Sequence, residues 1–236
     1  MIDMGYEIYK PEWGIQRPIR GVLFDMDGLV LDTEKLYSRF WREAVGAFGF
    51  EMTYAQSLRM RAVNSRLGEA ILHELYGPGA DFNKIRAKRI ELMDAYVAEH
   101  GVEAKPGIFE LLDYLEEHGI AAAITSSSPT DRIRAHLGSL GLYHRFARIC
   151  SCHEVPRGKP APAIYLHGAA SLGLPPEECL ALEDAPTGIR SAYDAGCLTA
   201  MIPDQDQPSA ETTALLYAKA DSLADIISLL ETIRSI

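Results

Sequence analysis

Residues 19–28 read IRGVLFDMDG, and this stretch decides the fold of the chain. The short apolar run from Ile19 to Phe24 is typical of a buried parallel strand. It ends abruptly in two carboxylates, Asp25 and Asp27, followed by Gly28. Charged groups at the mouth of a buried strand cost stability unless a cation or a reaction uses them. The stretch therefore predicts a magnesium site and phosphoryl chemistry at the end of the first core strand.

Strand-like and helix-like runs alternate in the second half of the chain. Such alternation predicts an α/β fold with a Rossmann-like, doubly wound parallel sheet. Strands are expected over 120–124, 147–150, 179–182 and 198–202, and helices over 130–140, 162–172, 188–195 and 223–233.

The region between the first strand and residue 103 has helical periodicity and contains no strand-like run. Thr33 is placed to cap its first helix. We expect a helical cap domain over 34–103, inserted into an α/β core domain formed by 19–33 and 104–236. Residues 1–18 have no clear periodicity and are expected to form an irregular N-terminal lead-in.

Three further polar motifs follow expected strands. In open parallel sheets, ligands bind at the carboxyl edge, so these motifs and Asp25 should converge on one crevice. Each motif alone is more typical of an ordinary loop, turn or helix start, and their order and placement carry the functional interpretation. The motifs are Thr125-Ser126-Ser127-Ser128, Gly158-Lys159-Pro160 and Glu183-Asp184.

These residue types can perform phosphoryl transfer. The Asp25 carboxylate can attack phosphorus and form an aspartyl-phosphate. Asp27 can protonate the leaving oxygen and later deprotonate the attacking water. Lys159 can place a positive charge on the transferring oxygens. The hydroxyl of Ser126, with Ser127 beside it, can bind another phosphate oxygen.

Magnesium is the expected cofactor, because attack by a carboxylate on an anionic phosphate requires cations and Mg²⁺ prefers oxygen ligands. Asp25 and Asp184 can supply carboxylates, Asp27 its backbone carbonyl, and Glu183 further negative charge. A calcium loop of the EF-hand type is not completed, since residue 29 is leucine and the later ligands are absent.

With these four motifs the chain resembles the haloacid-dehalogenase-like hydrolase superfamily, and within it the phosphatase and beta-phosphoglucomutase-like branch. The resemblance covers about Ile19 to the C-terminus. It implies a helical cap that opens and closes over the site, magnesium, Asp25 as nucleophile and Asp27 as the acid–base residue. The similar segments are Phe24–Glu34, Ile124–Pro129, Arg157–Tyr165 and Leu182–Gly188.

Departures from that branch bear on the substrate. Tyr37 stands where the mutases have a cap histidine, and Asn64 aligns with a cap arginine that would hold a second phosphate, which makes mutase activity less favoured. The cap residues expected to face the leaving group are Tyr37, Trp41, Arg61 and Asn64, with Arg66 nearby. The alternative, that Trp41 belongs to the cap core and the arginines are solvated, stays open.

Composition limits the partners. The formal charge is −10, from 33 acidic against 23 basic residues, which argues against nucleic acid or an anionic membrane as partner. No stretch has transmembrane length and the first 20 residues lack a signal-peptide core, so a cytoplasmic protein is expected. We also expect it to be a monomer.

The predicted function is magnesium-dependent hydrolysis of a small phosphorylated metabolite, either a sugar phosphate or a nucleoside-like monophosphate. A sugar phosphomutase is the alternative. A non-catalytic phosphometabolite-binding protein ranks last, because Asp25, Asp27, Lys159 and Asp184 are all present.

Overall fold

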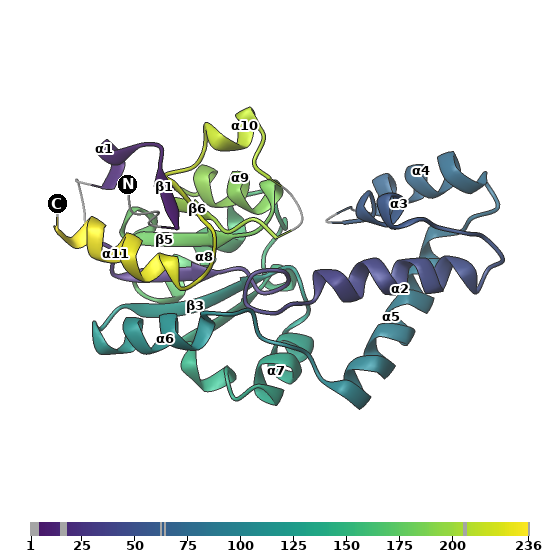
Figure 1. Ribbon diagram of the computed structural model, residues 1–236, viewed down its shortest axis with the longest axis horizontal. Helices are drawn as coiled ribbons and strands as arrows, with labels where there is room; N and C mark the ends of the chain where they lie inside the picture. The colour runs from purple at the N-terminus through teal and green to yellow at the C-terminus, as the bar shows by residue number, and fades with distance from the viewer. Residues whose placement is uncertain (1–4, 15–17, 62, 64, 205–206, 236) are drawn as a thin grey trace. The chain divides into compact units, whose positions relative to one another are not determined.

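A computed structural model describes residues 5–14, 18–61, 63, 65–204 and 207–235. The chain divides into two compact units (Figure 1). One unit combines Met1–Leu31 with Glu103–Ile236, and the other is Asp32–Val102.

The first unit is built on a sheet that, within the described residues, has seven strands in the order β1-β7-β6-β5-β2-β3-β4. Neighbouring strands from β7 to β4 pair in parallel, which confirms the predicted α/β class. The strands are β1 (Tyr6–Ile8), β2 (Gly21–Phe24), β3 (Ala121–Ser126), β4 (Arg148–Ser151), β5 (Cys179–Glu183), β6 (Leu198–Met201) and β7 (Ala218–Ala220).

The centre of the sheet is the pair β2 and β5. Every residue of both strands is buried, because helices cover both faces of a doubly wound sheet and such strands need no polar face. Phe24 is in register with Leu182 of β5 and with Ile124 of β3. The residues that follow these three strands therefore emerge at one edge.

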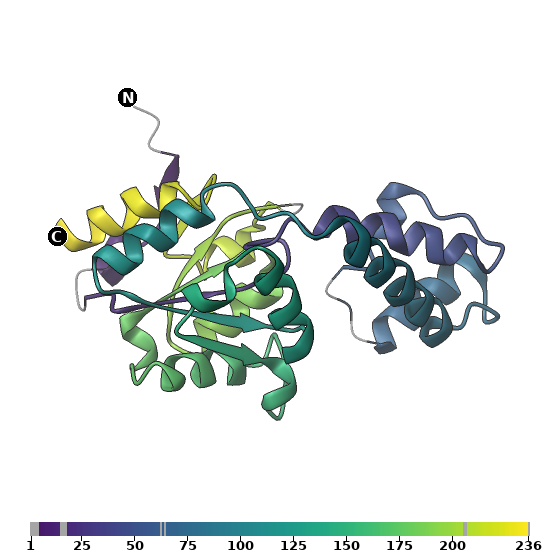
Figure 2. The same cartoon turned by 90° about the horizontal axis from the view of Figure 1, so that it is seen from below.

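Helices cover both faces of this sheet. Helices α8 and α9 contact each other and strands β2 to β6, while α6 and α11 pair on the opposite face (Figure 2). The helices of this unit are α1 (Pro11–Gly14), α6 (Ile108–Glu117), α7 (Thr130–Ser139), α8 (Ala163–Ser171), α9 (Pro186–Asp194), α10 (Ala210–Thr213) and α11 (Asp225–Ser235). Three short 3₁₀ turns are η1 (Tyr143–Arg145), η2 (Cys152–Glu154) and η3 (Pro176–Glu178).

The second unit is helical in its described residues. Its core packs α2 against α5, with Trp41 stacked on Phe82 at a ring-centroid distance of 5.9 Å. Thr33 precedes α2 but makes no side-chain capping bond, because its backbone is already in the helical region, so the expected cap is wrong. The helices are α2 (Glu34–Gly46), α3 (Tyr54–Leu58), α4 (Ser65–Tyr76) and α5 (Phe82–His100).

The N-terminal lead-in is more ordered than predicted. Strand β1 pairs antiparallel with β7 and extends the edge of the sheet, so residues 1–18 are not wholly irregular and the sheet is not wholly parallel. The hydroxyl of Tyr6 lies 2.7 Å from that of Thr232 on α11. Lys10 donates a hydrogen bond to the carbonyl of Ala214. These contacts attach the segment to the C-terminal part of the unit.

The two points where the chain leaves and re-enters the first unit lie side by side. Leu31 forms an antiparallel bridge with Ala104, and the Lys105 N–H donates to the carbonyl of Val30 at 2.9 Å.

Among the helices of the described chain, none has both the length and the apolar character needed to cross a membrane.

Candidate active site

The carboxyl edge of the sheet brings together residues from four parts of the chain. Asp25 follows β2, and its N–H donates to the carbonyl of Leu182 at 3.0 Å. Ser126 ends β3, Glu183 ends β5, and Lys159 lies in the loop before α8. The predicted convergence at this edge is therefore present within the first unit.

A tight turn after β2 sets the position of Asp27. Gly28 has a φ of +91°, a conformation that side-chain-bearing residues rarely adopt. Its N–H donates to the Leu31 carbonyl at 2.9 Å, and the N–H of Val30 donates to Met26 at 3.0 Å. These bonds fold the segment back on itself just beyond the strand, so that Asp27 stays at the sheet edge.

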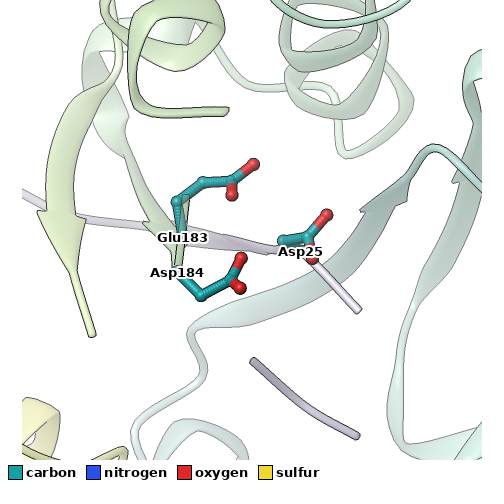
Figure 3. Close-up of side chains that lie close together, drawn as sticks. All are labelled: Asp25, Glu183 and Asp184. Atoms are coloured by element: carbon teal, nitrogen blue, oxygen red, sulfur yellow. The ribbon is translucent and has the colours of Figure 1, made fainter. Parts of the chain in front are cut away.

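The side chains of Asp25, Glu183 and Asp184 cluster at this edge (Figure 3), and the Lys159 side chain lies beside them. Carboxylate oxygens of Asp25, Glu183 and Asp184 lie within 4.8 Å of one another. The Lys159 ammonium lies 2.5 Å from Asp25 Oδ1 and 2.6 Å from Glu183 Oε1. Tyr165, fully buried on α8, also donates its hydroxyl hydrogen to Glu183 Oε1. The lysine is therefore fixed between two carboxylates in a buried, charge-dense site.

Burial dominates the electrostatics of this cluster. It raises the pKa of the Asp25 carboxyl from 3.8 to about 8, an effect that Lys159 opposes and that Glu183 and Asp27 reinforce. Burial alone would lower the pKa of Lys159, but Asp25 and Glu183 outweigh it and hold that pKa well above its ordinary value. The lysine stays charged, and Asp25 ionises only at a cost that a nearby cation would remove.

The donor set fits a hard divalent cation. Three carboxylates around one ammonium leave an excess of negative charge in a region where Asp25 is 8 % exposed and Glu183 is 1 % exposed. Carboxylate oxygens are the ligands that Mg²⁺ and similar cations prefer. The cluster contains Asp25, Glu183 and Asp184 but not the carboxylate of Asp27.

The Asp27 carboxylate is bound instead by the serine loop that follows β3. The hydroxyl of Ser128 donates to Asp27 Oδ2 at 2.9 Å. The Ser128 N–H in turn donates to Ser126 Oγ at 3.0 Å, which leaves the Ser126 hydroxyl hydrogen to donate elsewhere. Ser127 is exposed on the same loop. Two predicted residues, Ser126 and Asp27, are thus linked through a third that the prediction did not select.

Ser128 and Tyr165 are the two site residues that sequence reasoning missed. Both stand inside segments recognised for other residues, the serine run and the lysine motif. A phenol six residues after Lys159, in the first turn of a mostly apolar helix, was the available signal for Tyr165. The spacing of Ser128 contains no comparable signal, since its partner lies 101 residues away.

The candidate substrate residues of the helical unit are not equivalent. Trp41 is 5 % exposed and packs in the core of that unit, which favours the alternative that it belongs to the cap core over a role facing the leaving group. Tyr37 is half-buried, with the Arg89 guanidinium 4.8 Å from its ring centroid. Arg61 is half-buried and donates to the Leu58 carbonyl at 3.3 Å. Asn64 lies outside the described residues.

A protein-family model matches most of the chain. A model described as haloacid dehalogenase-like hydrolase matches residues 22–202, a span that includes every motif of the edge site.

Individual relatives are similar over most of the chain. Hexitol phosphatase A of Escherichia coli K12 is 34 % identical over 182 residues, covering 75 % of this chain and 80 % of that protein. Fructose-1-phosphate phosphatase YqaB of the same organism is 31 % identical over 179 residues, covering 75 % and 92 %. A crystal structure of a HAD family hydrolase from Deinococcus radiodurans, with bound phosphate and sodium, matches with a TM-score of 0.77 and 26 % identity, covering 93 % and 98 %.

Proposed function

This chain belongs to the haloacid dehalogenase-like hydrolase family, and on that premise we propose that it hydrolyses a small phosphomonoester through phosphorylation of Asp25. One observation carries the proposal. A buried nucleophilic carboxylate is paired with Lys159 at 2.5 Å and stands beside two further carboxylates at the edge of a parallel sheet. A fold hosts many chemistries, so the proposal rests on this constellation rather than on the sheet alone.

In the first step an oxygen of Asp25 forms a bond to phosphorus while the bond to the leaving oxygen breaks. Asp27 gives its proton to that oxygen, and an alcohol departs. In the second step water attacks phosphorus and Asp27 takes its proton. The bond between Asp25 and phosphorus breaks, and inorganic phosphate leaves with both aspartates restored.

The other residues stabilise charge and fix orientation. Lys159 is held by Asp25 and Glu183, so its positive charge is in place before the phosphate arrives, which is the arrangement that stabilises a transition state most effectively. The Ser126 hydroxyl is oriented by the Ser128 amide and would donate to a phosphate oxygen. Backbone amides of the same loop would assist.

Magnesium is part of the proposal. Asp25 and Asp184, with the main-chain carbonyl of Asp27, would hold the ion, and Glu183 would add negative charge beside them. When bound, the ion supplies positive charge that screens the nucleophile from the phosphate and polarises the phosphoryl oxygens.

A sugar phosphate is the substrate class that we favour over a nucleoside monophosphate. Its support is the set of relatives, of which one is named a hexitol phosphatase and another a fructose-1-phosphate phosphatase. The choice among sugars would depend on the helical unit, for which Tyr37 and Arg61 stay candidates. A cytoplasmic, monomeric protein stays a prediction from the sequence. A phosphomutase stays the alternative, with no described residue that favours it.

The test is phosphate release from para-nitrophenyl phosphate and from fructose 1-phosphate, with Mg²⁺ or with chelator. We expect metal-dependent turnover that Asp25→Asn abolishes, because an amide cannot form the acyl phosphate. Asp113→Asn is the matched control, since this aspartate is exposed on α6 and its carboxylate pairs with Arg145 at 2.6 Å.

Turnover that persists in Asp25→Asn would contradict the proposed nucleophile. Turnover that chelator does not reduce would contradict the proposed dependence on a metal ion. Interconversion of sugar phosphates without net release of phosphate would favour the phosphomutase.

A further inference from the structure

Ser128 is a buried serine whose hydroxyl donates a hydrogen bond to the acid–base candidate. Its Oγ donates to Asp27 Oδ2 at 2.9 Å, and the residue is 7 % exposed. The two residues come from different loops, one after β3 and one after β2, 101 positions apart. The contact therefore joins two neighbouring strand ends directly at the site.

Ser128 itself is held from two sides. Its N–H donates to Ser126 Oγ at 3.0 Å, and its carbonyl accepts a hydrogen bond from the Ser151 hydroxyl at 2.7 Å. Ser126 ends β3, and Ser151, which is fully buried, ends β4. Because strands β3 and β4 are paired up to these two residues, the loop that carries the Ser128 hydroxyl is tied to rigid elements.

We propose that Ser128 is a positioning residue, which orients the Asp27 carboxyl group for proton transfer to the leaving oxygen. The inference rests on the proposed function. A carboxyl group on a part-exposed aspartate rotates about its side-chain bonds, and anchoring Oδ2 fixes where Oδ1 lies. Proton transfer is efficient only when donor and acceptor are within hydrogen-bond reach, so an anchored carboxyl group delivers its proton more often than a free one.

The proton transfer accompanies the bond changes at phosphorus that are described above. While the bond from Asp25 to phosphorus forms and the bond to the leaving oxygen breaks, the proton of the Asp27 carboxyl group moves to that oxygen. The Ser128 hydroxyl keeps its own proton throughout. Its contribution should therefore depend on how much the leaving oxygen needs a proton.

The test compares two esters of nearly equal shape, phenyl phosphate and para-nitrophenyl phosphate. Phenolate is a poor leaving group that needs protonation, whereas para-nitrophenolate leaves without it. The measured quantity is kcat/KM, which includes steps only up to departure of the phenol. Ser128→Ala keeps the N–H and carbonyl bonds of residue 128 and should fold, which a thermal melt would verify.

We expect Ser128→Ala to lower kcat/KM for phenyl phosphate about 10-fold, part of the roughly 10²–10⁴ that a general acid supplies. The value for para-nitrophenyl phosphate should change by less than about 2-fold, because little proton transfer accompanies its departure. A merely structural role would lower both values together. Ser139→Ala is the matched control on α7, where an exposed serine donates its hydroxyl to the His136 carbonyl at 2.8 Å.

Asp27→Asn separates this inference from the function on which it rests. Suppose that Asp27→Asn lowers kcat/KM for phenyl phosphate much more than for para-nitrophenyl phosphate. If Ser128→Ala then behaves as wild type, or lowers kcat/KM equally for both esters, the positioning role is refuted and the acid–base role stands. If Asp27→Asn affects both esters alike, or if the wild type hydrolyses neither, the proposed function fails and the inference fails with it.

Discussion

Replacing Gly188 by alanine would place a methyl group on top of the Glu183 carboxylate. A Cβ built at Gly188, in the first turn of α9, lies 1.9 Å from Glu183 Cδ and Oε1 and 2.1 Å from Oε2. Non-bonded carbon and oxygen atoms approach no closer than roughly 3–3.5 Å, so either the carboxylate or the helix must move by more than about 1 Å. The glycine is therefore needed for close approach rather than for backbone conformation.

Glu183 cannot move without losing stability, because one oxygen of its carboxylate accepts two hydrogen bonds. The residue is 1 % exposed, and Oε1 accepts hydrogen bonds from Lys159 at 2.6 Å and from Tyr165. Breaking a buried ion pair costs about 3–5 kcal/mol, and a rearrangement that keeps one bond should cost about 3 kcal/mol. For a chain of this size that loss lowers Tm by roughly 6–12 °C.

The catalytic rate should fall by more than the loss of folding stability alone would cause. A displacement of about 1 Å at a reacting site can cost a factor of about 10² in rate, and Lys159, which contacts Asp25, would follow Glu183. We expect Gly188→Ala to lose at least that factor in kcat/KM for para-nitrophenyl phosphate. Gly138→Ala on α7 is the matched control, because its Cβ meets nothing within 4 Å and alanine there should be neutral or stabilise the helix by up to about 1 kcal/mol.

A second change identifies the clash itself. Glu183→Asp shortens the side chain by one methylene group and makes room for the new methyl group. Glu183→Asp should lower Tm less in the Gly188→Ala background than in the wild type, because in that background it also relieves the clash. The value of kcat/KM should stay low, because the shorter carboxylate no longer reaches Lys159. A Gly188→Ala protein with wild-type Tm and wild-type kcat/KM would refute the reasoning.

Three further outcomes are expected. Tyr165→Phe keeps the ring but removes one donor to Glu183, so thermal unfolding should show a loss of about 1–3 kcal/mol; an unchanged Tm would mean that the hydroxyl contributes nothing. Trp41→Ala leaves a cavity beside Phe82 and should destabilise the helical unit by about 3–5 kcal/mol by calorimetry, and a small effect would argue against a core role. Because burial raises the pKa of Asp25 to about 8, the folded metal-free protein retains a proton that the unfolded chain releases near pH 4, and its stability should fall as pH rises toward 8. Urea unfolding in chelator should give a flatter pH dependence for Asp25→Asn, and equal slopes would contradict the shift.

The sheet and the main site residues could be predicted from sequence because both depend on local signals. A buried parallel strand has a continuous apolar run, and a carboxylate directly after it is conspicuous. Asp25, Ser126 and Glu183 each lie at or just after the end of a predicted strand, and strand pairing then brings them together. Nothing beyond the order of the motifs and the rule for parallel sheets was required.

The elements that escaped prediction depend on distant partners. Strand β7 has only three residues, Ala218–Ala220, and two of them are alanine, so its strand character comes from pairing with β6 and β1. Strand β1 likewise becomes a strand only through a neighbour more than 200 residues away. Trp41 was placed among substrate residues for its size and ring, although it lies three residues before Ala44 on the apolar face of α2 that forms the core.

The contacts of the site give a reason why Lys159 is held by Glu183 as well as by Asp25, the proposed nucleophile. If Lys159 were paired only with Asp25, any phosphate that bound Asp25 would have to compete for the lysine. Glu183 holds the same ammonium at 2.6 Å and is itself held by Tyr165, so the lysine stays in place when Asp25 changes its bonding. The cost is a third buried carboxylate, which the fold tolerates because Gly188 leaves room for it and because Asp25 can be neutralised by a proton or a cation. In the proposed mechanism, stability is given up at this edge to keep one positive charge fixed where negative charge would develop during phosphoryl transfer.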